Sequence, residues 1–248
     1  MLPLSLVLAM FAAPAPNAAD PAATAIADQV MTALGGEAAW RSTRFLRFDF
    51  AVESEGKIVS SRSHYWDKWT GRYRVEGKDK QGAYQVLMNL NSREGSAWRD
   101  GKPAEGEARK QLLEQGYGAW VNDSYWLLMP YKLRDPGVSL KLEGETKEGD
   151  AVYDRLLLTF DKVGLTPKDR YWVFVNRATH LVDRWEYILE DEKGPATRWE
   201  WRGWKRFGGI ELAPERISEK TKRRILFPVL DVPATIPDTV FTSPEAVR

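Results

Sequence analysis

The chain has 248 residues, enough for one large β or α+β domain, or two small ones, that buries about 70% of its unfolded surface. It contains no Cys, which excludes disulfides, Cys-ligated metal centres and thiol nucleophiles. The 36 Lys and Arg residues balance 35 Asp and Glu residues, and the formal charge of +1 gives no case for nucleic acid as a partner. The unusual feature is the aromatic content, with 11 Trp, 9 Tyr and 9 Phe.

The N-terminus has the composition of a secretion signal. Leu2 to Ala13 form an apolar run of signal-peptide length, followed by Ala, Pro and Asn up to Asp20. The run is too short to span a bilayer, and no later segment approaches 18 uninterrupted apolar residues. We therefore expect a cleaved signal peptide at residues 1–19 and a single exported, periplasmic domain at residues 20–248, with no integral membrane segment. A disordered Ala/Pro tail is the alternative for the first 19 residues.

Apolar residues at helical spacing between Ala22 and Leu34, followed by Gly35-Gly36, predict one amphipathic helix. From Phe45 the period becomes two, which predicts a half-buried strand. Further strand-like runs, separated mostly by Gly-containing turns, lie at residues 58–66, 72–76, 84–90, 96–99, 139–143, 152–160, 170–176, 181–189, 197–207, 210–218 and 222–229. The tail from Asp231 is rich in Pro and is expected to be irregular.

Residues 105–129 interrupt this series of strands. Leu113, Tyr117, Trp120 and Tyr125 fall on one helical face, which predicts a helix, or a helix pair interrupted near Gly116 and Gly118. The pattern as a whole is mainly β (α+β). A long antiparallel sheet of about twelve strands must curl, and a helix can cover its concave face.

Several strands carry apolar residues on both faces. In residues 171–175, Tyr171 and Val173 alternate with Trp172 and Phe174, so both faces of this strand are apolar. A curved sheet covered by helices, or one that holds an apolar ligand, accounts for this pattern. The many Trp residues are either core filler or the lining of such a cavity.

Catalytic chemistry has little support in the sequence. The two His residues, His64 and His180, show no metal-ligand spacing, and no G-x-S-x-G or phosphate-binding glycine motif occurs. We expect no catalytic residue, no metal and no cofactor. Acidic pairs such as Asp183 with Glu186, or Glu190 with Asp191, leave a carbohydrate-active hydrolase open as an alternative.

A basic cluster lies near the last predicted strand, at Lys220, Lys222, Arg223 and Arg224. Lys residues at sheet edges discourage pairing with other chains, and a solvated edge is the simpler interpretation. Contact with an anionic headgroup is the alternative.

The leading helix is followed by TRFLRFDF (43–50), HYWDKWTGRYRVEG (64–77) and YQVLMNLNSREGSAWRDG (84–101). This series resembles the N-terminal half of the LolA-like outer-membrane lipoprotein carrier superfamily. DSYWLLMPYKLRDPGVSL (123–140) further resembles an exported, uncharacterised branch of that superfamily. The resemblance implies a curved, incompletely closed antiparallel β-barrel, with helices over the concave face of a cavity that receives acyl chains. It also implies Arg72 or Arg74 as the arginine that contacts the lid.

We therefore expect a non-catalytic, monomeric carrier that binds a lipid or acylated lipoprotein and meets envelope transport partners. Alternation and helix-face arguments give the candidate cavity residues Leu46, Phe48, Phe50, Tyr73, Val86, Met88, Trp120, Trp126, Leu128 and Trp172. A structural interaction module of the cell envelope, with a fully packed interior, is the other alternative.

Overall fold

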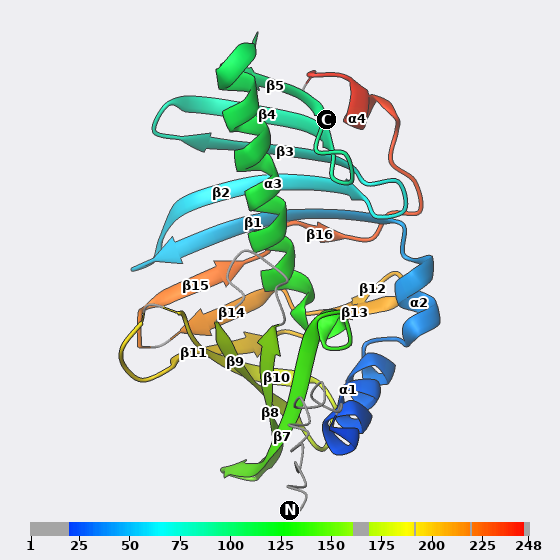
Figure 1. The fold of residues 1–248 in the computed structure, drawn as a ribbon, viewed down its shortest axis with the longest axis vertical. Helices are drawn as coiled ribbons and strands as arrows, with labels where there is room; N and C mark the ends of the chain where they lie inside the picture. Colours follow the sequence, from blue (N-terminus) through cyan, green and yellow to red (C-terminus); the bar gives the residue numbers. More distant parts are fainter. Residues whose placement is uncertain (1–19, 161–168, 191, 219, 246–248) are drawn as a thin grey trace, which may run out of the picture.

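The computed structural model describes residues 20–160, 169–190, 192–218 and 220–245 (Figure 1). The expected signal peptide at residues 1–19 lies outside these ranges. The helices are α1 (Pro21–Ala33), α2 (Glu37–Ser42), α3 (Gly106–Leu128), the 3-10 helix η1 (Met129–Lys132) and α4 (Thr239–Thr242). The strands are β1 (Phe45–Ser54), β2 (Lys57–Asp67), β3 (Arg72–Asp79), β4 (Gly82–Asn89), β5 (Gly95–Arg99), β6 (Lys102–Pro103), β7 (Val138–Glu148), β8 (Ala151–Phe160), β9 (Arg170–Asn176), β10 (Val182–Ile188), β11 (Thr197–Arg202), β12 (Lys205–Phe207), β13 (Ile210–Leu212), β14 (Glu215–Ser218), β15 (Arg223–Leu226) and β16 (Leu230–Asp231).

One antiparallel sheet dominates the fold. Within the described ranges it has 14 strands in the order β6-β5-β4-β3-β2-β1-β15-β14-β11-β10-β9-β8-β7, and β16 pairs with β1 beside this path. The end strands β6 and β7 do not pair with each other in the part of the chain that the structure describes, so the sheet curls without closing. Figure 1 shows α3 crossing one face of the sheet, while α1 lies near β7. The predicted fold class, an incompletely closed antiparallel barrel with an N-terminal helix and a mid-chain helix over its concave face, is confirmed.

The alternation in β1 separates two environments. Leu46, Phe48 and Phe50 are almost fully buried on the inner face, where the ring of Phe48 stacks on His64 at 4.4 Å between centroids. Arg47 and Asp49 lie on the opposite face and form an ion pair of 2.6 Å. Period-two patterning therefore assigns the correct face to this strand.

The predicted N-terminal helix is confirmed as α1, and its first turn is capped. The Asp20 carboxylate accepts hydrogen bonds from the backbone N–H groups of Ala22 and Ala23, at 2.9 and 3.2 Å. Its other oxygen accepts from the backbone N–H of Leu142 in β7 at 2.8 Å. The same side chain thus begins the helix and attaches it to the edge of the sheet.

The mid-chain helix α3 is continuous over 23 residues, so of the two predicted alternatives the single helix is correct and the pair interrupted near the glycines is not. Gly116 is buried against the sheet, and a Cβ atom there would lie 3.0 Å from Val86 Cγ1. The glycine therefore allows the helix and β4 to approach closely, and tertiary packing offsets its low helix propensity.

Three other expectations need correction. The run 197–207 is divided at Gly203, whose φ of +77° suits glycine, into β11 and β12. The run 210–218 is divided at Ala213-Pro214 into β13 and β14, because proline lacks the N–H that a strand ladder needs. The tail after Asp231 contains helix α4 rather than only irregular chain.

Candidate functional site

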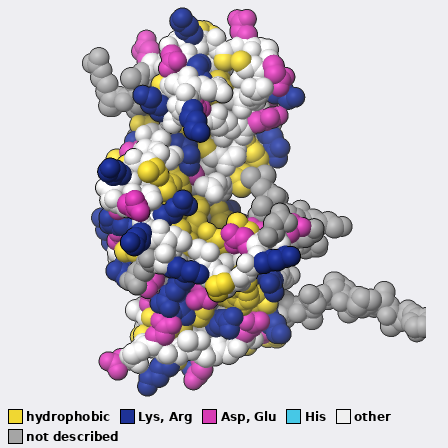
Figure 2. Space-filling model, turned by 90° about the vertical axis from the view of Figure 1, so that its left-hand side faces the viewer, with side chains coloured by type: hydrophobic (Ala, Val, Ile, Leu, Met, Phe, Trp, Pro, Cys, Tyr) yellow, Lys and Arg dark blue, Asp and Glu magenta, His cyan; other side chains and the backbone are white. Residues whose placement is uncertain are grey.

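A cavity of about 560 Å³ lies between the C-terminal half of α3 and the strands β8–β10. The helix lines it with Tyr117, Trp120, Val121, Ser124 and Tyr125, whose spacing of three or four places most of them on one side of α3. The remaining lining residues are Asn122, Trp126, Lys132, Asp135, Pro136, Val138, Phe160, Asp169, Tyr171, Trp185, Tyr187 and Leu189. Figure 2 shows an apolar hollow at mid-height on one side of the molecule, with Lys and Arg side chains beside it.

Aromatic rings pack against one another around this cavity, in edge-to-face and tilted pairs. The ring of Trp185 lies 4.6 Å from Trp126, 5.4 Å from Tyr171 and 5.9 Å from Tyr125, measured between centroids. Tyr171 in turn contacts Phe160 at 5.5 Å. Such contacts add to the stability gained by burial and hold each ring in place. The result is a preformed apolar wall.

The charged groups of the lining already have protein partners. Lys132 Nζ lies 3.1 Å from Asp135 Oδ2. Asp169 accepts hydrogen bonds from the backbone N–H of Glu190 at 3.0 Å and from the Tyr171 hydroxyl at 3.3 Å. Burial raises the pKa of the Tyr125 hydroxyl well above its ordinary value, which keeps that group neutral. These contacts leave the apolar surface as the main feature that the cavity offers to a ligand.

Two of the predicted cavity residues, Trp120 and Trp126, line the cavity. Seven others lie in the packed core, each no more than 6% exposed: Leu46, Phe48, Phe50, Tyr73, Val86, Met88 and Leu128. The side of the sheet formed by β1–β5 is therefore filled by side chains, and the open space lies on the β8–β10 side.

Trp172 lies on the outer face of the sheet, contrary to the expectation that it lines the cavity. Its Nε1 donates a hydrogen bond to Glu143 Oε2 at 2.9 Å, and the Arg155 guanidinium lies 5.3 Å from its ring centre. The preceding residue, Tyr171, faces the cavity, and neighbouring residues of a strand point to opposite faces.

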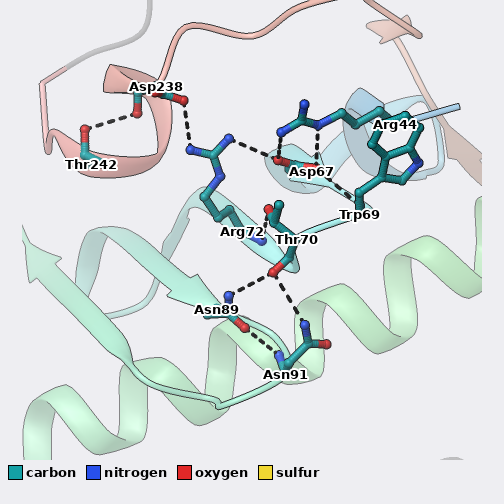
Figure 3. Close-up of polar contacts among 9 residues, drawn as sticks. All are labelled: Arg44, Asp67, Trp69, Thr70, Arg72, Asn89, Asn91, Asp238 and Thr242. Atoms are coloured by element: carbon teal, nitrogen blue, oxygen red, sulfur yellow. Dashed lines mark hydrogen bonds and ion pairs between the residues drawn. The ribbon is translucent and has the colours of Figure 1, made fainter.

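Arg72 and Arg74 contact the C-terminal segment rather than α3. Figure 3 shows Arg72 between Asp67 and Asp238 of the α4 N-terminus, with α3 on the far side of the strands; the two ion pairs measure 3.0 and 2.8 Å. The fully buried Arg74 donates hydrogen bonds to the carbonyl oxygens of Val240 at 3.0 Å, Ser243 at 2.8 Å and Glu245 at 2.6 Å. The expected contact with a lid on the concave face is thus replaced by contacts with the chain end on the outer face.

A buried polar network, not predicted from the sequence, joins α3 to β2 and β3. Asp123 of α3 binds Arg62 Nε at 2.6 Å and Arg62 Nη2 at 2.8 Å. His64 Nε2 lies 2.9 Å from Asp123 Oδ2, in a contact too bent for a regular hydrogen bond, and His64 Nδ1 lies 2.7 Å from the Tyr73 hydroxyl. Asp123, His64 and Tyr73 are completely buried, so the network holds the helix in place and is closed to substrates.

The charge states of this network follow from its surroundings. Burial alone raises the pKa of the Asp123 carboxyl, but the interactions with His64 and Arg62 outweigh it and hold the pKa below its ordinary value. Burial lowers the pKa of His64 despite the nearby carboxylate. A neutral imidazole with its proton on Nε2 fits both contacts, because Tyr73 can then donate its hydroxyl hydrogen to Nδ1.

The structure does not place the acidic pairs expected from the sequence at the cavity, and it shows no metal-binding cluster among the described residues. No cluster of three or more His, Asp or Glu residues that could hold a metal ion occurs there. Asp183 accepts a hydrogen bond from Asn176 at 2.7 Å, Glu186 lies 3.4 Å from Arg184, and neither lines the cavity. Of the second acidic pair, Glu190 donates its backbone N–H to Asp169, and Asp191 lies outside the described residues.

Sequence reasoning missed most of the aromatic lining. Tyr171, Trp185 and Tyr187 come from adjacent strands that pair in register, Trp185 with Val173 and Tyr187 with Tyr171. The sequence did carry one signal: side chains alternate between the two faces of a strand, and the odd-numbered residues of these two strands include all three aromatic ones. Choosing that face as the inner one required knowledge of where α3 lies.

None of the helices in the described residues is long and apolar enough to cross a membrane. Family models do not match the sequence, and no curated protein sequence matches it.

Solved structures are similar in fold. A DUF1329 family protein from Desulfovibrio piger superimposes with a TM-score of 0.52 at 13% identity, over 88% of this chain and 96% of that chain. A LolA superfamily protein from Nitrosomonas europaea superimposes with a TM-score of 0.50 at 11% identity, over 89% of this chain and 97% of that chain. The chain therefore has the LolA-like fold, an incomplete antiparallel β-barrel with helices over its concave face.

Proposed function

We propose that this protein binds the hydrocarbon chain of a lipid or of an acylated lipoprotein in the cavity beneath α3, as a non-catalytic carrier in the periplasm. The observation that carries the proposal is the aromatic cavity of about 560 Å³, a volume within the usual range of small-molecule sites. The similarity in fold to a LolA superfamily protein supports the same assignment.

Hydrocarbon binding needs only apolar surface and space. Each CH₂ group transferred from water to such a site contributes about 0.8 kcal/mol, so a chain of several carbons gains useful affinity without any specific polar contact. The rings around Trp185 offer that surface, and the ion pair of Lys132 with Asp135 lies among the lining residues. We infer that the apolar part of the ligand occupies the aromatic wall while its polar end stays near this ion pair.

The two alternatives have less support. A hydrolase of the acidic-pair type needs two carboxylates that converge on one substrate, whereas Asp183 and Glu186 bind other side chains outside the cavity. A purely structural module would have a filled interior, whereas the space under α3 is open.

The experiment is lipid extraction and native mass spectrometry of the full chain, together with titration by a fluorescent fatty-acid probe. Val121 lies on the cavity side of α3, so Val121→Trp fills the space, and we expect probe affinity to fall at least about tenfold. Lys110→Trp is the matched control, because Lys110 is exposed on the same helix and does not line the cavity.

Saturable probe binding that Val121→Trp weakens and Lys110→Trp leaves unchanged supports the proposal. A protein that carries no lipid and binds no probe contradicts it. Equal binding by wild type and Val121→Trp would place the probe elsewhere and also contradict the assigned site.

A further inference from the structure

Two turns of the sheet lie side by side, far apart in sequence. The β1–β2 turn is formed by Glu55 and Gly56, both with positive φ. The backbone N–H of Glu55 donates to the carbonyl oxygen of Lys222 at 3.3 Å, and Ser54 pairs with Arg223 in the ladder between β1 and β15. Figure 1 shows the turn after β1 and the turn before β15 on the same side of the sheet.

Two exposed aliphatic side chains follow the first of these turns, at the start of β2. Ile58 is 54% exposed and Val59 is 63% exposed, the two most exposed aliphatic residues among the described large hydrophobic ones. Val52 pairs with Ser60 and Glu53 with Ile58, which leaves Val59 as the extra residue of a β-bulge. A bulge changes the direction of the side chains around it, and the two residues at this one are exposed to solvent.

Exposed cations lie in the same strand and in the neighbouring turn. Lys57 precedes the apolar pair, and Lys220, Lys222 and Arg223 lie in or beside the adjacent β14–β15 turn, all four exposed. Within the described chain these four side chains form no ion pair. Arg224 differs, because its guanidinium binds Glu53 and Glu215. We name the set of Lys57, Ile58, Val59, Lys220, Lys222 and Arg223 the basic tip.

The charge of the basic tip is not neutralised by the described carboxylates around it. Glu55 is exposed in the first turn, and Glu53 is already paired with Arg224. Glu219, next to Lys220 in the sequence, lies outside the described residues. Even when both Glu55 and Glu219 are counted, the four cations give the two turns a positive net charge.

The basic tip also lies near the cavity. Arg223 pairs with Ser218 of β14, and the preceding residue, Ile217, pairs with Glu200 of β11. Trp199 of β11 pairs with Trp185 of β10, which lines the cavity together with Tyr187. Leu189, partly exposed at 37%, continues the cavity lining two residues further along the chain.

We propose that the basic tip docks this protein onto an anionic phospholipid surface, with Ile58 and Val59 entering the headgroup region and the cations contacting lipid phosphates. Exposed aliphatic side chains with Lys and Arg around them fit the chemistry of such an interface. Each cation close to an anionic leaflet strengthens binding by about fivefold, and the attraction weakens as salt screens it. Docking there brings the cavity close to the source or destination of an acyl chain.

The test is cosedimentation of the full chain with vesicles of phosphatidylcholine, with and without phosphatidylglycerol. We expect binding to the vesicles that contain phosphatidylglycerol and its loss at high salt. The double variant Lys222→Glu/Arg223→Glu should lower partitioning by about 25-fold or more, since it removes two cations. Ile58→Ser/Val59→Ser should lower it at least about tenfold.

Matched controls separate the tip from general effects. Lys102→Glu/Lys110→Glu makes the same change of charge at exposed positions outside the tip, and Val229→Ser removes an aliphatic group that is 40% exposed elsewhere. Both should bind vesicles within about twofold of wild type. Val121→Trp should still dock, because docking does not use the cavity, and the tip variants should still bind the fatty-acid probe.

Failure to bind vesicles containing phosphatidylglycerol overturns the inference. So does binding that does not depend on phosphatidylglycerol, or an equal loss in Lys102→Glu/Lys110→Glu. If a tip variant does not fold, as judged by circular dichroism, the test rests on the wild-type protein. Binding that requires phosphatidylglycerol and is lost at high salt then supports the inference, and binding without either dependence overturns it.

Discussion

Arg216 of β14 donates a hydrogen bond from Nε to the carbonyl oxygen of Trp126, in the last turn of α3, at 3.1 Å. Its other donors reach the carbonyl oxygens of Leu127 at 3.4 Å, Ala213 at 2.6 Å and Glu215 at 3.1 Å. Carbonyl groups at a helix C-terminus have no partner within the helix, and a cation there is favourable. The buried guanidinium therefore fixes the end of α3 that lines the cavity.

We predict that Arg216→Lys lowers the free energy of unfolding by about 2 kcal/mol, because one ammonium cannot reach carbonyl groups that a planar guanidinium bridges. The stacking of Arg216 on Trp201, at 3.4 Å to the ring centre, is lost as well. Urea unfolding followed by Trp fluorescence measures the change. Arg206→Lys, at an exposed site, serves as the control, and equal stability of the two variants would contradict the prediction.

Asp123 should make the protein sensitive to acid. Its pKa is lower in the folded chain than its ordinary value of 3.8, so its contribution to stability is complete above that pH and is lost as pH falls through the folded value. His64, with a pKa below its ordinary value of 6.5, acts in the same direction, because unfolding at pH below 6.5 lets it bind a proton. Tyr73, Tyr84 and Arg62 also face this site, and none of them titrates in the acid range.

We predict that Asp123→Asn lowers the free energy of unfolding by about 3 kcal/mol at neutral pH, because the Arg62 charge loses its carboxylate partner. The same variant should show a shallower loss of stability below pH 4 than wild type. Urea unfolding at a series of pH values tests both parts. If the free energy of unfolding falls as steeply below pH 4 in Asp123→Asn as in wild type, the prediction is wrong and other carboxylates cause the loss of stability.

Asp67 and Asp238 offer a matched comparison, because Arg72 binds both (Figure 3). The Asp67 side chain is completely buried and also binds Arg44 at 2.9 Å, whereas that of Asp238 is 81% exposed. We predict that Asp67→Asn costs about 2 kcal/mol of stability and that Asp238→Asn costs less than about 0.5 kcal/mol. Thermal unfolding of the two variants decides; similar costs would mean that burial does not set the strength of these pairs.

The sequence pattern was sufficient to predict features that depend on residues close together in the chain. The alternation at Leu46, Phe48 and Phe50 identified the buried face of β1, and the helical spacing of apolar residues between Ala22 and Leu34 identified α1. It failed where distant segments meet. Arg62 and Asp123 are 61 residues apart, and nothing in either segment indicates that a helix carboxylate will lie over that strand.

The two apolar faces of β9 had a different cause from the one inferred. Its outer face is covered by arginines, with Arg184 stacked on Phe174 at 3.5 Å and Arg155 near Trp172 at 5.3 Å. An aromatic residue under a guanidinium can lie outside a core, since cation–π contact replaces apolar packing. Period-two patterning therefore could not place Trp172, because both environments accept aromatic side chains.

Two glycines of α3 separate helix propensity from packing. A Cβ at Gly118 would meet nothing within 4 Å, whereas one at Gly116 would lie 3.0 Å from Val86 Cγ1. We predict that Gly118→Ala raises the free energy of unfolding by about 0.5–1 kcal/mol, because alanine loses less conformational entropy in a helix. Gly116→Ala has the same intrinsic gain, but crowding against β4 should cancel or exceed it.

Removing the crowding atoms with Val86→Ala creates a cavity of its own, so the informative quantity is the coupling energy of the double-mutant cycle. We expect Gly116→Ala to be more favourable in the Val86→Ala background than in wild type, whereas Gly118→Ala should be equally favourable in both. Urea unfolding of wild type and the five variants measures these differences, and a Gly116→Ala effect that is independent of Val86 would show that the close approach of α3 to β4 does not limit the residue at this position.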